Sequence, residues 1–137
     1  MSLLGIFDVA GSALSAQSVR LNTVASNLAN AGDVAGSEAQ AYRARVPVFQ
    51  AVLDPLRPDA PARGVRVAGV AQSPDPVPRR YWPQHPLADA QGYVYLSNVN
   101  PVEAMADMIA ASRAYQNNVE VLKTSRQLLL QVLRLGE

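Results

Sequence analysis

Apolar residues recur at alternating spacings of four and three along the first 30 residues of the chain. The positions that follow this spacing are Leu3, Phe7, Ala10, Leu14, Gln17, Leu21, Val24 and Leu28. Seven of these eight are apolar, and residues 3–30 contain no Pro. Such a stripe is typical of a helix that packs along one face. The pattern therefore predicts a helix over residues 1–30, and its other face carries Ser, Thr and Asn in place of the usual charged residues.

The last 38 residues begin with a helix start signal. Asn100 is suited to cap a helix, Pro101 fits the first helical position, and Glu103 stands where a capping-box carboxylate belongs. The same three-four spacing continues through Met105, Met108, Ser112, Tyr115, Val119, Leu122, Arg126, Leu129 and Leu133. The sequence thus predicts a helix over residues 100–137. A helix of this length is a rod of roughly 50 Å, too long for the interior of a compact domain of this size.

Residues 31–99 form a different kind of segment. Nine of the ten Pro residues lie between Pro47 and Pro86, so a long helix is excluded there. Three short stretches have the alternation or the β-branched and aromatic content of strands, at residues 42–46, 64–68 and 91–96. The prolines at 55, 58, 61, 74, 76 and 78 exclude central strands between them. We expect a small, irregular, β-rich middle.

Together these segments predict one domain of 137 residues with a mainly α fold. The N- and C-terminal helices form an antiparallel coiled-coil-like hairpin, and the β-rich middle joins them. A two-helix hairpin covers only one stripe on each helix, so we expect other subunits to bury the remaining apolar and amide side chains. The residues expected at subunit interfaces are Leu14, Leu21, Asn22, Val24, Asn27, Leu28, Asn30, Met108, Tyr115, Val119, Leu122 and Leu129.

Composition excludes several classes of function. The net charge is +1 and only 17% of residues are charged, which is too balanced for a general nucleic-acid binder. The chain has no Cys and one His, so we expect no disulfide, no metal site and no cofactor. No run of 18 apolar residues occurs, which argues against membrane insertion. The N-terminus also lacks the basic residue and the uninterrupted apolar run of a cleaved signal peptide.

Candidate catalytic chemistry is confined to His85 and Asp89, which are four residues apart. Such a pair is the starting point for acid–base catalysis, but Pro86 disfavours placing both on one helix. No Gly-x-Ser-x-Gly nucleophile motif accompanies the pair. We therefore expect no enzyme, and a periplasmic cell-wall enzyme built on this pair is a remote hypothesis.

Two blocks of sequence resemble a known family. The block Ser18-Val19-Arg20-Leu21-Asn22-Thr23-Val24-Ala25-Ser26-Asn27-Leu28-Ala29-Asn30 resembles the N-terminal signature of bacterial flagellar rod and hook proteins. A second block runs from His85 to Val119 and includes Asn98-Val99-Asn100 and Arg113-Ala114-Tyr115-Gln116-Asn117-Asn118. It resembles the members of that family that form the proximal rod of the basal body.

The resemblance implies a structural subunit of the flagellar basal-body proximal rod. Such a subunit polymerises through its terminal helices and transmits torque from the motor to the hook. Its partners are other flagellar rod proteins, copies of itself and the flagellar type III export apparatus, which exports it without a cleaved signal peptide into the periplasm-spanning rod. The alternative that the residues leave open is a cytoplasmic helical adaptor or export chaperone, although such a protein usually displays a charged face.

Overall fold

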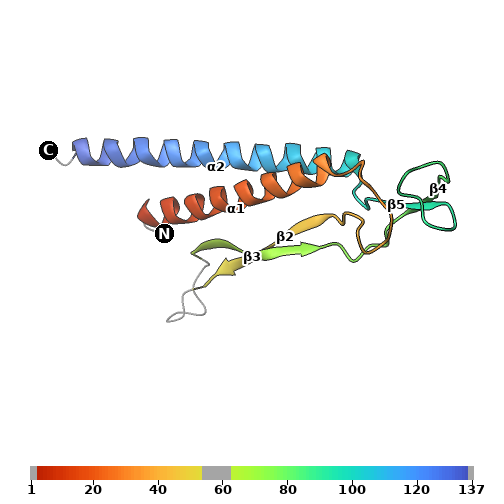
Figure 1. Ribbon diagram of the computed structural model, residues 1–137. Coiled ribbons are helices and arrows are strands. Elements are labelled where there is room, and N and C mark those ends of the chain that lie inside the picture. The colour runs from red at the N-terminus through yellow and green to blue at the C-terminus, as the bar shows by residue number, and fades with distance from the viewer. Residues whose placement is uncertain (1–2, 54–62, 136–137) are drawn as a thin grey trace. The chain divides into compact units, whose positions relative to one another are not determined.

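The computed structural model describes residues 3–53 and 63–135 (Figure 1). The elements in chain order are α1 (Leu3–Ala29), β1 (Val34–Ala35), β2 (Arg45–Val52), β3 (Gly64–Gln72), β4 (Arg79–Tyr81), β5 (Tyr93–Leu96) and α2 (Pro101–Leu135). The stretch that holds Pro55, Pro58 and Pro61 lies outside the described residues, as do the outermost residues of both predicted helices, 1–2 and 136–137.

Both helices are present where the apolar spacing predicts them, with 27 residues in α1 and 35 in α2. The predicted cap of α2 is confirmed. The side-chain Oδ1 of Asn100 accepts hydrogen bonds from the backbone N–H groups of Val102 at 3.1 Å and Glu103 at 3.4 Å. These contacts satisfy two of the donors that a helix start leaves without partners. The first turn also carries Glu103, whose charge suits the positive end of the helix dipole.

The prediction of a mainly α fold is wrong. Helix accounts for about half of the described residues and strand for about a fifth, and the strands form antiparallel sheets with regular pairing. The coiled-coil-like hairpin with an irregular middle is therefore only part of the architecture. The middle is more regular than its prolines suggested because β2 and β3 form a sheet of only two strands. Both are edge strands, a position at which a proline such as Pro47 is tolerated.

The second sheet has three short strands in the order β1-β5-β4, all antiparallel. Val34 of β1 lies opposite Leu96 of β5, and Arg79 of β4 lies opposite Tyr95. β1 follows α1 closely in the chain, and β5 comes shortly before α2. This sheet therefore ties the end of one helix to the start of the other.

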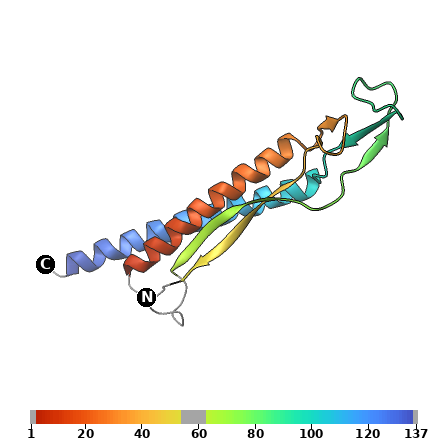
Figure 2. The same ribbon diagram turned by 60° about the horizontal axis from the view of Figure 1, so that its bottom comes forward.

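The chain divides into two compact units, and both helices run through both of them. The terminal unit comprises residues 1–21, 47–69 and 109–137, and the connector unit comprises residues 22–46 and 70–108. In the terminal unit, α1 and α2 run side by side in opposite directions (Figure 1), and the strands of the β2–β3 hairpin lie beside α1 (Figure 2). Whether the chain is a single domain remains a prediction.

The core of each unit is built mostly from small side chains. In the terminal unit the buried residues are Ala10, Ala16, Ala111 and Ser125. In the connector unit Val24, Val99 and Ala104 form the centre of a cluster. Val94 is the largest fully buried side chain among the described residues. Small residues let two helices approach closely, but they bury little apolar area.

Neither described helix is long and apolar enough to cross a membrane. The part of the chain that the structure describes also holds no group of three or more His, Asp or Glu side chains that could bind a metal ion.

Candidate subunit interface

Asn27 connects the last turns of α1 to the start of β2. Its side-chain Nδ2 donates to the carbonyl oxygen of Arg45 at 2.7 Å, and its Oδ1 accepts from the Arg45 N–H at 2.8 Å. The hydroxyl of Tyr42 donates to the same Oδ1 at 3.0 Å. The amide thus pairs with one residue of β2 as a neighbouring strand would. Because the Asn27 side chain is buried, these contacts also satisfy polar groups that water cannot reach.

Asn98 makes an equivalent connection from the other side of the connector unit. Its Oδ1 accepts from the Ala44 N–H at 2.6 Å, and its Nδ2 donates to the carbonyl oxygen of Asp75 at 3.0 Å. Ala44 and Arg45 are consecutive, so two amide side chains hold the backbone of one short segment. Helical periodicity cannot reveal this role, because the partners are backbone groups more than 15 residues away in the chain.

The three amides predicted to bond to neighbouring chains differ in their surroundings. Asn27 is buried with its own chain's partners, and the Nδ2 of Asn30 donates to the carbonyl oxygen of Ser26 at 2.7 Å. Only Asn22 is exposed. The contacts of Asn27 and Asn30 stabilise the fold of their own subunit, and Asn22 alone presents its amide to the outside.

The predicted apolar interface residues line the inner sides of the two helices. In the connector unit Val24 is buried, and Leu28 and Met108 pack against its cluster. In the terminal unit six residues are half-buried, namely Leu14, Leu21, Tyr115, Val119, Leu122 and Leu129. The helices therefore share these residues within one chain, and part of each side chain stays accessible.

Larger apolar side chains lie outside this seam. The described residues include 18 large hydrophobic side chains that are exposed. On α2 they are Val102, Met105, Ile109, Val121, Leu128, Leu130, Val132 and Leu133. Most of the remaining ones lie on or next to the β2–β3 hairpin, at Val46, Val48, Phe49, Val52, Leu53 and Val70. Pairing the two helices thus leaves these side chains exposed within one chain.

The hairpin is attached to α1 at one close contact. The Val65 N–H donates to the Oγ of Ser12 at 3.1 Å, and that hydroxyl donates in turn to the carbonyl oxygen of Val9 at 2.8 Å. A β-carbon added to Gly64 would lie 2.5 Å from the same Oγ. Glycine at this position therefore allows the strand to approach the helix.

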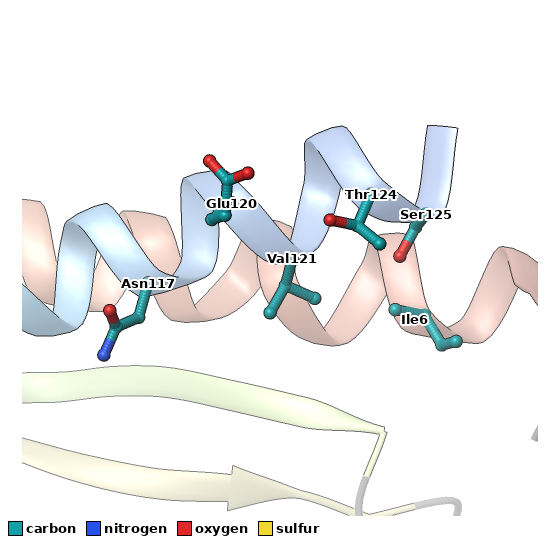
Figure 3. A pocket seen from close by; sticks show the side chains of 6 residues that line it. All are labelled: Ile6, Asn117, Glu120, Val121, Thr124 and Ser125. Atoms are coloured by element: carbon teal, nitrogen blue, oxygen red, sulfur yellow. The ribbon is translucent and has the colours of Figure 1, made fainter. Parts of the chain in front are cut away.

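An open groove lies in the terminal unit between α1 and α2 (Figure 3). Its lining residues are Ile6, Asn117, Glu120, Val121, Thr124 and Ser125. Ile6 of α1 lies next to Ser125 of α2 in this view, and Val121 points toward the hairpin side. The lining offers one carboxylate, and Glu120 already forms an ion pair with Lys123 at 3.7 Å. The groove thus resembles an unfilled packing surface more than a binding site for a small molecule.

His85 and Asp89 are occupied by the loop that contains them. The Nδ1 of His85 accepts a hydrogen bond from the Leu87 N–H at 3.1 Å. The Oδ1 of Asp89 accepts from the N–H groups of Gln91 and Tyr93, both at 2.9 Å. These are turn contacts of the kind that Asp commonly makes with backbone groups just ahead of it. The two side chains do not form a catalytic pair.

Comparisons with known proteins agree on one family. The family profile described as flagella basal body rod protein matches residues 7–36, and the one described as flagellar basal body rod FlgEFG protein C-terminal matches residues 90–135. The flagellar basal-body rod protein FlgC of Yersinia enterocolitica is 52% identical over 137 residues, and all of both chains is covered. The chain belongs to the FlgC family of flagellar basal-body rod proteins. FlgC of Escherichia coli O157:H7 and of Salmonella typhimurium are 52% and 50% identical over the same full length.

The family assignment confirms the resemblance found in the sequence. The chain is a structural subunit of the flagellar basal-body rod, and it assembles with other rod components. FlgC proteins are structural and are not enzymes. The two profiles cover most of α1, β1, part of the loop before β5, β5 itself and α2, and they leave residues 37–89 unmatched. The two profiles thus match mainly the helices and strands β1 and β5, whereas the FlgC relatives match the whole chain.

Proposed function

We propose that this chain builds the rod by burying its exposed apolar surface against neighbouring subunits. The observation that carries the proposal is the distribution of side-chain size. Small residues such as Ala10, Ala16 and Ala111 fill the core, while 18 large hydrophobic side chains among the described residues remain exposed. A soluble monomer usually buries such residues first. Large exposed apolar side chains in such number are typical of an interaction site.

The face of α2 that carries Val121, Leu128 and Val132 is the strongest part of this surface. Val121, Leu128 and Val132 are 45%, 48% and 57% exposed, and their spacing of seven and four places them on one side of the helix. Covering the exposed half of such a side chain stabilises an interface by about 1 kcal/mol. Repeated in every subunit and on more than one face, these contributions sum to a stable assembly.

The β2–β3 hairpin contributes a second surface. Most residues of both strands are exposed. A two-stranded sheet alone in water is marginally stable, and its open edges invite further pairing. We infer that neighbouring subunits cover this hairpin in the rod. The half-buried seam residues, for example Tyr115 and Leu129, and the exposed Asn22 supply further contacts between chains.

Helices packed along their length suit the transmission of torque from motor to hook. Sliding one helix past another requires many apolar contacts to break together, because side chains interdigitate at the density of a protein interior. We infer that copies of this chain and other rod proteins pack in this way. The same surfaces then resist shear and hold the polymer together.

We further propose that the chain leaves the cytoplasm through the flagellar type III export apparatus and keeps its N-terminus. The family assignment supports this route, because the rod lies outside the cytoplasm. Mass spectrometry of the N-terminal peptide from purified basal bodies tests it. An intact N-terminus agrees with the proposal, and removal of a leader contradicts it.

One substitution on the face of α2 that carries Leu128 and Val132 tests the assembly proposal. Val132→Asp replaces an exposed apolar side chain by a charged one, so we expect the isolated subunit to keep its thermal midpoint. Because the apolar contact with a neighbouring subunit is removed, we expect loss of the variant from purified basal bodies. The matched control is Gln131→Asp, which adds the same charge at an exposed polar position of the same helix. Normal incorporation of the Val132→Asp variant contradicts the proposal.

A further inference from the structure

A cluster at the end of β4 combines a cation with aromatic and apolar side chains. The guanidinium carbon of Arg80 lies 5.3 Å from the centroid of the Trp82 ring, and that ring lies 4.7 Å from the His85 ring. Leu87 lies next to them, with its N–H donating to His85. Trp82 is 42% and Leu87 48% exposed. We name these four residues, Arg80, Trp82, His85 and Leu87, the Arg80 surface.

Within the described residues, the Arg80 surface has no anionic partner. Arg80 has no carboxylate within 4.0 Å among the residues that the structure describes. A guanidinium stacked on an aromatic ring keeps its N–H edge available, and this edge matches the two oxygens of a carboxylate. The exposed indole and Leu87 favour an apolar neighbour. The surface therefore fits a carboxylate that is flanked by apolar side chains.

The first turns of α2 offer this combination. Glu103 is exposed, and its carboxylate has no ion-pair partner within the described part of the chain. Val102 is 76% and Met105 52% exposed beside it. A Met thioether contacts aromatic rings favourably, so Met105 is suited to the face of Trp82. We name Val102, Glu103 and Met105 the Glu103 surface.

We propose that the Arg80 surface of one subunit docks on the Glu103 surface of a second copy of this chain. The proposal rests on the self-assembly proposed above and names the residues that make one of its contacts. The cation of the Arg80 surface complements the carboxylate of the Glu103 surface, and both surfaces carry exposed apolar side chains. The two surfaces share no residue. A contact between two unlike surfaces is heterologous, so its repetition produces a ring or an open helix instead of closing after two subunits. A rod requires this kind of contact.

A charge exchange tests the pairing. Arg80→Glu and Glu103→Arg each place like charges together, and we expect either one to lower the amount of subunit in purified basal bodies about tenfold. Combining both restores opposite charges, so the amount should return to within about twofold of the wild type. The control combines Arg80→Glu with Asp33→Arg, which gives the same net charge but alters an exposed carboxylate next to Val34, outside the Glu103 surface. It should remain as low as Arg80→Glu alone. Normal incorporation of both single variants, or equal rescue by the control, overturns the proposal.

Cysteine cross-linking supplies a second, independent measurement, because the chain contains no Cys of its own. A variant carrying both Leu87→Cys and Val102→Cys should give a ladder of subunit multiples when basal bodies are oxidised. Either substitution alone should give no ladder. Incorporated subunits that yield only monomers overturn the proposal, and so does a cross-link to a chain of another mass. Absence of the wild-type chain from basal bodies would instead refute the proposed function, so the two failures are distinguishable.

Discussion

Replacing Asn27 tests how the end of α1 is held to β2. Asn27→Ala removes three hydrogen bonds, two with the backbone of Arg45 and one with the Tyr42 hydroxyl. A hydrogen bond contributes about 1 kcal/mol net, and partners left buried without one add to the cost. We expect a loss of about 2–4 kcal/mol in the free energy of unfolding. For a chain of this size, that corresponds to a fall of about 10 °C in the melting temperature.

Two further variants make this test specific. Asn22→Ala changes the same residue type at an exposed position of the same helix, so its effect should stay within about 0.5 kcal/mol. Asn27→Asp keeps an acceptor for the Arg45 N–H and for Tyr42, but it places a carboxylate oxygen against the Arg45 carbonyl, where Nδ2 now donates at 2.7 Å. It should destabilise at least as much as Asn27→Ala, because burying a charge is costly and the carboxylate oxygen that faces the Arg45 carbonyl has no donor. Thermal melts of the purified subunit by circular dichroism measure all three. Equal midpoints for Asn27→Ala and Asn22→Ala would refute the reasoning.

Three other substitutions have expected outcomes. Gly64→Ala places a β-carbon 2.5 Å from the Oγ of Ser12, so it should lower the free energy of unfolding by about 1–2 kcal/mol. An unchanged melting temperature would show that the hairpin does not depend on this contact. Gln17→Met should raise the free energy of unfolding by about 1 kcal/mol, because the buried Oε1 of Gln17 has no hydrogen-bond partner in the described residues. A lower midpoint of the thermal melt would contradict this expectation. Leu122→Asp places a charge in the half-buried seam between the helices. It should therefore reduce both the melting temperature and incorporation into basal bodies. Loss of incorporation with an unchanged melting temperature would place Leu122 outside the seam.

The sequence predicted those features whose cause is local. Apolar spacing located both helices, and Asn100 followed by Pro101 marked the start of α2 because a helix cap depends on neighbouring residues alone. Strands were predicted at residues 42–46 and 64–68, but the extension of β2 to Val52 and its pairing with β3 were missed, because no local signal shows which strands pair. Contacts between segments far apart in the chain determine which strands pair.

The candidate interface shows the same division. Val24 and Leu28 follow the helical repeat, and their places in or against a buried cluster agree with it. The role of Asn27 was not predictable, since its partners at residues 42 and 45 are brought to it only by the fold. The exposed face formed by Leu128 and Val132 also depends on which side of α2 the other helix occupies. Periodicity cannot decide between two apolar sides of one helix.

The central claim is that neighbouring subunits cover the apolar face of α2 in the rod. It is tested most directly by the reactivity of Leu128→Cys toward a maleimide reagent in a chain that has no other Cys. Gln40→Cys, at an exposed polar position of the connector unit, serves as the reference. We predict rapid labelling of both cysteines in the isolated subunit and strong protection of Leu128→Cys alone in purified basal bodies. Equally rapid labelling of Leu128→Cys in both states would contradict the account.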